Sequence, residues 1–400
     1  MTTTLSGIKV VDLSRVLAGP WVTQTLADLG ADVIKIERPV TGDDTRSWGP
    51  PYYDMAGDRL SAYFTSANRG KKSICIDITE EKGRDLVASL TVKADIFVEN
   101  FKVGDLANRG LDYKTLSADN PGLIYCSITG FGQTGPYKNR PGYDFMIQAM
   151  GGLMSITGEP DDNSDGGPQK VGVALVDILT GLYSTIAILA AVNERTASGK
   201  GQYIDMALLD VMAASLANQA ANYLVSGVAP ERLGNAHPNI VPYQTFATAD
   251  SYMIVAVGND NQFSRLCDVV GRPELAGDGD YANNARRVEN RSKLEKELQA
   301  AIKLKSTKRW LELMEKAGVP CGPINDIGEM FSDPQVQHRK MEIEIEGIPL
   351  VGNPIKYSRS TLKYDKPPPR LGEHTDNVLG SELGLDPDEI QQLRKEGIVA

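Results

Sequence analysis

I-K-V-V-D-L-S-R-V-L-A-G-P-W-V-T-Q-T-L-A-D-L-G-A-D-V-I-K-I-E-R, residues 8–38, is the stretch that decides the fold class. Its apolar run at 8–13 predicts a buried strand, and a Gly-Pro loop leads into a helix expected over about 21–29. A glycine ends that helix, and residues 32–38 predict a second strand. Strand, helix and strand in this order form a βαβ unit, whose two strands are parallel.

The alternation of strands and helices continues along the first half of the chain. Three more apolar runs predict strands and one charged segment predicts a helix: strands at 73–78, 95–101 and 123–129, and a helix at 80–91. This order is typical of a doubly wound α/β sheet. Two long helices are expected next, over about 178–197 and about 204–226.

A change in composition near residue 235 indicates a second, smaller domain. Residues 241–258 predict two short strands, and charged helices are expected over 261–318. The last helix, expected at 387–396, belongs to a tail that we expect to pack back on the first domain. The resulting domain boundaries are 1–227 (large domain), 228–325 (small α+β domain) and 326–400 (C-terminal return to the large domain).

Charge and cysteine usage argue against several classes of protein. The formal net charge is −10, and no block of Lys and Arg predicts a surface for nucleic acid. With no run of about 18 apolar residues and no signal-peptide pattern at the start, we expect no contact with a membrane. The four cysteines are far apart and form no C-x-x-C, which argues against zinc and against a disulfide framework. The expected compartment is the cytoplasm, or an organelle matrix if a presequence is missing.

Two common catalytic classes find little support in the motifs. The loop R-V-L-A-G-P-W at 15–21 is not the G-x-G-x-x-G of a dinucleotide site, so a nicotinamide or flavin enzyme is a weak alternative. Arg38, at the carboxyl end of the second strand, is either a ligand of an adenosine phosphate or a solvated surface charge. With three histidines and neither H-E-x-x-H nor G-x-S-x-G, a catalytic nucleophile would be a carboxylate or a thiol.

A lone acid stands at the head of a long apolar run, V-A-L-V-D-I-L-T-G, residues 173–181. Burying an unpaired carboxylate is costly, so Asp177 is either satisfied locally or kept for chemistry. The local interpretation is a helix cap, because the loop ends and a helix of about 20 residues begins here. In that geometry the first amides of the helix would point at the carboxylate and keep it ionised.

Eight segments of the chain are distinctive as a set: V-V-D-L-S-R-V-L-A-G-P (10–20), A-D-V-I-K-I-E-R (31–38), A-D-I-F-V-E-N-F (94–101), N-P-G-L-I-Y-C-S-I-T-G-F-G-Q-T-G-P (120–136), G-Y-D-F-M-I-Q-A-M-G-G-L-M (142–154), V-A-L-V-D-I-L-T-G-L-Y (173–183), E-R-T-A-S-G-K-G-Q-Y-I-D (194–205) and G-V-P-C-G-P-I-N (318–325). Together they resemble the class III coenzyme A transferases, the CaiB/BaiF family, in family order across almost the whole chain. These enzymes transfer CoA between carboxylic acids.

The resemblance implies a fold, a nucleophile and a set of CoA contacts. The fold would be an interlocked homodimer, with a Rossmann-like large domain built from both chain ends and a smaller domain from the middle. Asp177 would be the nucleophile, passing through an aspartyl anhydride and an aspartyl-CoA thioester without a metal or a permanently bound cofactor. Coenzyme A and acyl-CoA would be substrates. The positions implied to contact CoA are Val16, Leu17, Ala18, Arg38, Ile76, Thr79, Asn100, Phe101, Arg109, Arg140 and Tyr143.

Three positions depart from patterns found within the family. Many members have an arginine where this chain has Asn108, and members have a basic residue where this chain has Pro141. The adjacent Arg109 and Arg140 are therefore the candidates for phosphate contacts. The branch of 2-methylacyl-CoA racemases has G-H-D where this chain has G-Y-D around Tyr143. Without that histidine, the two-base proton transfer of a racemase is the weaker alternative.

Later segments bear on the acids that exchange CoA. The segments 221–227, 234–244 and 257–263 are similar to transferases of the succinyl-CoA:glutarate (hydroxymethylglutarate) type, which implies succinyl-CoA as donor and a dicarboxylate as acceptor. Gly258 and Asn259 match the place of the family's glycine-rich loop and are otherwise a helix cap. His237 is a candidate for the distal carboxylate and equally for a packed interdomain residue. Arg46 is a second candidate for that carboxylate, although its sequence favours a solvated surface charge. A non-catalytic CoA-binding homologue remains an alternative for the whole chain.

Overall fold

The computed structural model describes residues 2–55, 58–162 and 166–400. The chain divides into two compact units, each built from segments distant in sequence. Unit 1 comprises Met1–Gly152, Val171–Ala220 and Gln335–Ala400, and unit 2 comprises Leu153–Lys170 and Ala221–Pro334. The domain boundaries expected at 227 and 325 stay a prediction, and the two units are described separately below.

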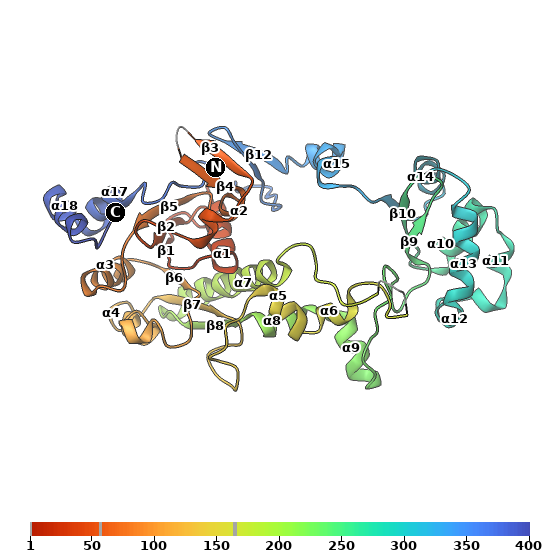
Figure 1. Cartoon of the computed structure of the whole chain (residues 1–400), viewed down its shortest axis with the longest axis horizontal. Helices are drawn as coiled ribbons and strands as arrows, with labels where there is room; N and C mark the ends of the chain where they lie inside the picture. Colours follow the sequence, from red (N-terminus) through yellow and green to blue (C-terminus); the bar gives the residue numbers. More distant parts are fainter. Residues whose placement is uncertain (1, 56–57, 163–165) are drawn as a thin grey trace. The chain divides into compact units, whose positions relative to one another are not determined.

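A parallel six-stranded sheet is the centre of unit 1 (Figure 1). Its strands, in spatial order, are β5 (Lys71–Cys75), β2 (Asp32–Glu37), β1 (Lys9–Asp12), β6 (Ile96–Glu99), β7 (Ile124–Thr129) and β8 (Tyr203–Ala207). Strand β1 lies in the middle, with Val11 opposite Ile34 of β2 and Phe97 of β6. The expected α/β class with a doubly wound parallel sheet is confirmed.

Alternate side chains of the strands enter different layers, because successive residues of a strand point to opposite faces. Val11, Ile34 and Ile74 join a buried cluster that includes Val87 and Leu90 of α3 (Glu81–Val92). Helices α1 (Ala18–Asp28) and α7 (Leu175–Ser198) pack against each other and against strands of the same sheet. The central strands are therefore buried, as near-continuous apolar runs require.

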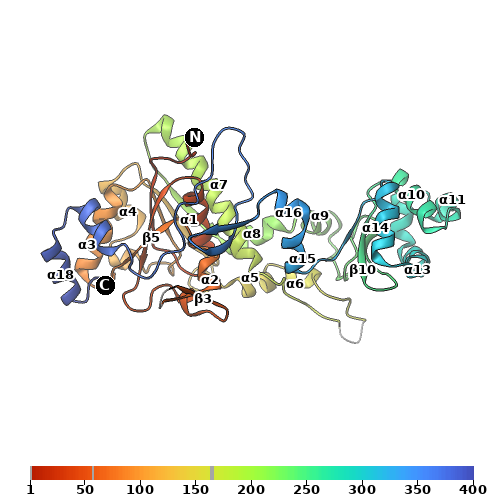
Figure 2. The ribbon, with the colours of Figure 1, turned by 90° about the horizontal axis from the view of Figure 1, so that it is seen from above.

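The C-terminal tail completes unit 1. Helix α17 (Thr375–Val378) packs against β5, and α18 (Pro387–Lys395) lies at the same end of unit 1 as α3 in both views (Figures 1 and 2). Thr375 Oγ1 accepts the Cys75 N–H, and the Ile398 carbonyl accepts the Asp77 N–H. Ile390 and Val399 enter the cluster formed by α3 and the sheet. The expected return of the tail to the N-terminal part is thus present in unit 1.

The helix expected over 204–226 is wrong in its first part. Residues Tyr203–Ala207 form β8, the edge strand beside β7, and two helices follow it, α8 (Leu208–Ser215) and α9 (Ala217–Ser226). The alternating pattern of Y-I-D-M-A suits a half-exposed edge strand, but it runs directly into apolar helical residues. Backbone pairing with β7 decides the conformation of this segment.

Unit 2 contains a small antiparallel sheet with helices packed on it. The sheet order is β11–β10–β9, and the two strands expected within 241–258 are confirmed. The elements of this sheet and its helices are β9 (Tyr243–Ala247), β10 (Tyr252–Ala256), β11 (Cys321–Pro323), α10 (Asp260–Val270), α11 (Glu274–Gly277), α12 (Asn284–Glu289), α13 (Arg291–Ile302) and α14 (Thr307–Lys316). Trp310, Phe246 and Met253 are among the buried residues of its own apolar core, so this unit has a separate hydrophobic centre.

The remaining elements are short. They are β3 (Tyr52–Met55), β4 (Asp58–Ser61), β12 (Glu342–Ile345), β13 (Ile348–Val351), α2 (Ala62–Thr65), α4 (Tyr113–Asp119), α5 (Asp144–Met150), α6 (Leu153–Ile156), α15 (Ile327–Ser332), α16 (Pro334–His338), the 3-10 turns η1 (Asp44–Ser47), η2 (Ala107–Arg109) and η3 (Gly279–Tyr281), and the π-helical turn η4 (Leu379–Leu383). Strands β3 and β4 pair with each other, as do β12 and β13.

Among the described residues, α7 is the one helix long and apolar enough to cross a bilayer by length and composition alone. Its mean hydropathy reaches 2.0 over an 18-residue window. The helix packs against α1, β7 and α8, as the core helix of an α/β unit does. The expectation that the chain meets no membrane stays a prediction.

Candidate active site

A pocket of about 480 Å³ opens where the strand order of unit 1 reverses. The connections from β1 and β6, which lie side by side, lead away in opposite directions, and such a point is where open α/β sheets bind ligands. The pocket is lined by Arg15–Ala18 after β1, Asn100–Val103 after β6, Ile128–Gly130 after β7, and also by Asp44, Trp48, Lys138–Tyr143, Asp177 and Leu208. Three loops at strand ends therefore form most of the pocket.

Asp177 reaches this pocket because α7 approaches α1 closely. At Gly181, a Cβ atom would lie 3.0 Å from the Cβ of Trp21 and 3.1 Å from the Ala18 carbonyl oxygen, both in α1. Residues four apart share one face of a helix, so Asp177 lies on the same face one turn before Gly181. The glycine thus turns the Asp177 face of α7 toward the loop that ends at Ala18.

The first amides of α7 are not available to Asp177. Ala174 occupies the cap position, and Asp144 Oδ1 accepts the N–H of Val176 at 2.8 Å and of Asp177 at 3.3 Å. Asp144 in turn is held by Gln148, whose Nε2 donates to Asp144 Oδ2 at 2.6 Å. The expectation that helix amides keep the Asp177 carboxylate ionised is wrong, because a second acid already accepts them.

The Asp177 carboxyl instead has a pKa close to neutrality. Burial raises the pKa of its carboxyl to about 7, and the charge of Asp144 adds to the effect. Within the described residues, no hydrogen bond reaches the Asp177 carboxylate, so nothing offsets the loss of hydration. Near neutral pH a large share of the molecules carry an ionised, weakly solvated carboxylate that faces the pocket.

Two glycines hold opposite walls of the pocket together. A Cβ atom on Gly130 would lie 2.4 Å from the Gly142 Cα, and one on Gly142 would lie 2.2 Å from the Gly130 Cα. Any side chain at either position would force the two backbones apart. This crossing keeps Arg140 and Tyr143 next to the end of β7.

Cations outnumber acids in the lining of the pocket. The cationic side chains are Arg15, Lys102, Lys138 and Arg140, and the acids are Asp44 and Asp177. Asp44 pairs with two guanidinium groups, at 3.1 Å from Arg15 and 2.6 Å from Arg38. The Arg140 guanidinium lies over the ring of Tyr137, with its Cζ 3.9 Å from the ring centroid. This distribution of charge suits a polyanionic ligand.

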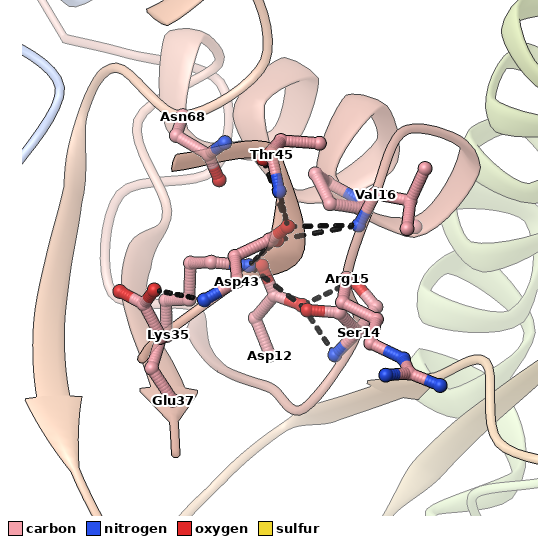
Figure 3. Close-up of polar contacts among 12 residues, drawn as sticks. Asp12, Ser14, Arg15, Val16, Lys35, Glu37, Asp43, Thr45 and Asn68 are labelled. Atoms are coloured by element: carbon pink, nitrogen blue, oxygen red, sulfur yellow. Dashed lines mark hydrogen bonds and ion pairs between the residues drawn. The ribbon is translucent and has the colours of Figure 1, made fainter. Parts of the chain in front are cut away.

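Buried charges lie directly beneath the loop after β1 (Figure 3). Asp12 pairs with Lys71 at 3.1 Å and Lys35 pairs with Asp43 at 2.9 Å, and all four side chains are completely buried. Burial alone would raise the pKa of Asp43, but the charge of Lys35 and the hydrogen bonds from Thr45 and Lys35 together outweigh it and lower the pKa to about 2. Burial beside these groups lowers the pKa of Lys71 to about 8.

Several residues expected at the site do not line the pocket. Arg46 forms a two-pronged ion pair with Glu37, with both distances 2.7 Å, and covers the Phe64 ring. Arg38 borders the pocket only through its ion pair with Asp44. The other three are the buried Ile76, the exposed Thr79, which bonds to Asp77, and Arg109, whose buried Nε has no hydrogen-bond partner among the residues that the structure describes.

The remaining expected residues belong to unit 2. Asn259 caps α10 by accepting the Gln262 N–H at 3.0 Å, and the Gly258 N–H donates to Gln262 Oε1. The cap that the sequence offered as an alternative for this loop is therefore formed. The His237 ring lies tilted against the Tyr243 ring, with centroids 5.3 Å apart, and burial followed by the charge of Arg291 lowers the His237 pKa.

Comparison with known proteins decides the family. The model of CoA-transferase family III matches residues 5–375. The chain belongs to this family. A family III CoA-transferase is an enzyme whose substrates are CoA thioesters. The resemblance inferred from the sequence segments is thus confirmed, and the cationic pocket at the switch point of the sheet suits such a substrate.

Relatives of this CoA-transferase include bacterial and human enzymes. It is 54% identical to a succinate–glutarate CoA-transferase of Agrobacterium fabrum, over 94% of each chain. It is 44% identical to the succinyl-CoA:glutarate CoA-transferase of Homo sapiens, over 99% of this chain and 90% of the human protein. A crystal structure of a CaiB/BaiF family protein from Brucella suis superposes with a TM-score of 0.86 at 54% identity, covering 96% of this chain and 100% of that one.

The CoA-transferase pocket contains side chains that the sequence did not single out. They are Arg15, Asp44, Trp48, Lys102 and Lys138. Arg15 and Lys102 each adjoin an expected contact, Val16 and Phe101, so proximity in sequence was an available signal for both. Asp144, which caps α7, follows Tyr143 directly but lies 33 residues from Asp177, and no local pattern joins the two.

Proposed function

We propose that this enzyme moves CoA from succinyl-CoA to a second dicarboxylic acid, with Asp177 as the nucleophile. The Asp177 carboxylate carries the proposal: it lines the pocket, has a pKa of about 7 and receives no hydrogen bond from the described residues. A more basic carboxylate is a better nucleophile, and incomplete solvation removes part of the cost of bringing it to an acyl carbon. The relatives that act on succinate and glutarate support the choice of acids.

The reaction needs four acyl transfers, and none requires a metal. An Asp177 oxygen attacks the thioester carbonyl and the C–S bond breaks. CoA departs as the thiolate, and a mixed anhydride of Asp177 and the donor acid remains. The thiolate then attacks the Asp177 carboxyl carbon, which releases the donor acid and leaves an aspartyl-CoA thioester. The acceptor carboxylate attacks that thioester, expelling thiolate, and the thiolate attacks the acceptor's carbonyl to release Asp177 and the new acyl-CoA.

The cationic lining supplies the binding part of the proposal. The phosphates of CoA carry several negative charges, and Arg15, Lys102, Lys138 and Arg140 surround the pocket. Val16, Leu17, Ala18, Asn100, Phe101 and Tyr143 would contact the less charged parts of the same molecule. The racemase alternative gains no support, because none of the described residues that line the pocket is a histidine.

Trapping the acyl-enzyme tests the proposal. Incubation with succinyl-CoA and hydroxylamine should convert Asp177 to a hydroxamate, detected by peptide mass, and Asp177→Ala should abolish exchange of labelled succinate into succinyl-CoA. The Asp144→Asn enzyme keeps the nucleophile and is the matched control, which should still be labelled. A fully active Asp177→Ala enzyme, or binding of CoA without any exchange, would contradict the proposal; the second result would favour a non-catalytic homologue.

We further propose a cytoplasmic homodimer. Exposed apolar side chains gather on α5 and α7, including Phe145 at 57% and Ile186 at 62% exposure, and a second copy of the chain is the partner we expect to cover them. Four free cysteines, three of them buried, agree with a reducing compartment. Light scattering should give twice the chain mass of 43.3 kDa, and a mass of 43.3 kDa would contradict the dimer.

A further inference from the structure

Val16, at the mouth of the pocket, has a backbone conformation that its side chain disfavours. Its φ is +72°, in the left-handed region, where β-branched residues are rare. Such a conformation persists only when its surroundings impose it. Residues 13–17 form the connection between β1 and α1, and three of them, Arg15 to Leu17, line the pocket.

A buried ion pair imposes the conformation from below (Figure 3). Both carboxylate oxygens of Asp43 accept the Val16 N–H, each at 3.2 Å. Lys35 Nζ donates to Asp43 Oδ2 at 2.9 Å and to the Ser14 carbonyl at 2.9 Å. Asp43 is itself fixed by Thr45, whose N–H and Oγ1 both donate to Asp43 Oδ1.

The contacts of this pair fall on either side of Arg15. The Ser14 carbonyl and the Val16 N–H are both bonded to the pair, while the Arg15 backbone exchanges two hydrogen bonds with the Asn100 side chain, at 3.0 and 2.7 Å. Both peptide groups that flank Arg15 therefore have a fixed partner for the N–H and for the carbonyl. The Arg15 side chain remains exposed and points its guanidinium at Asp44 in the pocket lining.

The cost of such a pair argues for a role beyond folding. Removing two charges from water often costs as much as their attraction returns, so a buried pair is weak evidence for stability. Another buried pair, Arg69 with Asp28 at 2.6 Å, bonds to Val351 and Asn353 outside the pocket. Buried Asp12, paired with Lys71, also meets the turn by accepting the Ser14 N–H at 2.9 Å, so Arg69–Asp28 is the buried pair that serves for comparison away from the turn.

We propose that Lys35 and Asp43 are positioning residues for acyl-CoA, which hold Val16 in its left-handed conformation and so fix the turn that presents Arg15 and Leu17 to the ligand. The proposal rests on the proposed function only in naming acyl-CoA as the occupant of the pocket. A positioning role differs from a stability role because it affects the binding of only one of the two substrates. Loosening the turn should weaken acyl-CoA binding and leave the acceptor acid unaffected.

The test compares Asp43→Asn with the matched control Asp28→Asn. Each change removes one buried charge, and both should lower the melting temperature. Asparagine at 43 keeps one oxygen that can accept the Val16 N–H but removes the charge and the second acceptor, so the charge-assisted bond becomes a weaker neutral one and the KM for acyl-CoA should rise roughly tenfold. The KM for the acceptor acid should change less than about twofold in both variants, and Asp28→Asn should leave the KM for acyl-CoA within about twofold.

Two double variants test the positioning role further. Adding Val16→Gly to Asp43→Asn should recover most of the loss in KM, because glycine adopts a positive φ without an anchor. If Asp43→Asn does not fold, the double variant Lys35→Met/Asp43→Asn leaves no unpaired buried charge and should show the same rise in KM.

Equal changes in Asp43→Asn and Asp28→Asn, equal rises in both KM values, or no recovery with glycine would overturn the proposal. Calorimetric titration with CoA alone separates it from the proposed function. An enzyme without transferase activity should still bind CoA more weakly after Asp43→Asn than after Asp28→Asn. Unchanged CoA binding would overturn the positioning role even if the transferase activity were confirmed.

Discussion

Replacing Asp177 with asparagine should stabilise the folded enzyme at alkaline pH while abolishing turnover. The pKa of the Asp177 carboxyl is about 7 in the folded chain, against 3.8 for an unperturbed carboxyl. Between those values the folded state binds more protons at Asp177 than the unfolded state does, so wild-type stability falls as pH rises through this window. Asparagine does not ionise, and the variant therefore escapes this loss.

The size of the effect follows from the shift. One pKa unit corresponds to about 1.4 kcal/mol, so the displacement from 3.8 to about 7 sets a ceiling of ~4 kcal/mol. Asp177 is only partly buried, and water at the pocket screens its charge, so we expect about 2–3 kcal/mol above pH 8. That corresponds to a rise in melting temperature of roughly 5–10 °C for a unit of this size.

Calorimetric melting of both proteins without substrate, at about pH 4, about pH 6 and about pH 8.5, is the assay. The difference in melting temperature should be close to zero at the lowest pH, grow through the middle value and level off at the highest. Asp54→Asn, at a side chain that is 82% exposed, is the control and should show no such trend. A difference that does not depend on pH, or a less stable asparagine variant at the highest pH, would refute the reasoning.

Three further changes test neighbouring parts of the structure. Asp144→Asn keeps an acceptor for the first amides of α7 but removes the charge that helps to raise the Asp177 pKa, so the acid limb of the pH–rate profile should move to lower pH. The limb should stay above the range of an ordinary carboxyl, because burial is the larger cause of the raised Asp177 pKa. Gly142→Ala places a methyl group against Gly130 and should reduce kcat/KM at least about tenfold, measured by exchange of labelled succinate. Asn259→Ala removes the cap of α10 and should cost about 1 kcal/mol in the unfolding of unit 2, measured by denaturant titration.

The sequence predicted the parallel sheet because its strands are continuous apolar runs with helices between them. It did not predict β8, because an edge strand half exposed to water is distinguished only by the partner it pairs with. For Asp177 it predicted a residue at a helix start, and the structure places it in the first turn of α7. The acceptor of the helix amides is Asp144, and only the folded chain brings that residue to the helix.

The pocket loops were predictable for a similar reason, since ligands bind at the carboxyl ends of parallel strands. The acid with which each cationic side chain pairs was not predictable. Arg46 and Arg38 have the residue type and the sequence position of substrate ligands, yet one is held by Glu37 and the other by Asp44. Which acid takes which guanidinium depends on contacts across strands and loops, and sequence spacing does not encode those contacts.

The crossing of Gly130 and Gly142 has a mechanical consequence. Two backbones in direct contact, with no side chain between them, cannot slide or separate without losing that contact, so the end of β7 and the segment carrying Arg140 and Tyr143 should behave as one rigid body. Any widening of the pocket to admit a bulkier acid must then come from other segments, such as the loop after β6. Directed evolution toward larger acceptors should accordingly accumulate changes around that loop and leave both glycines untouched.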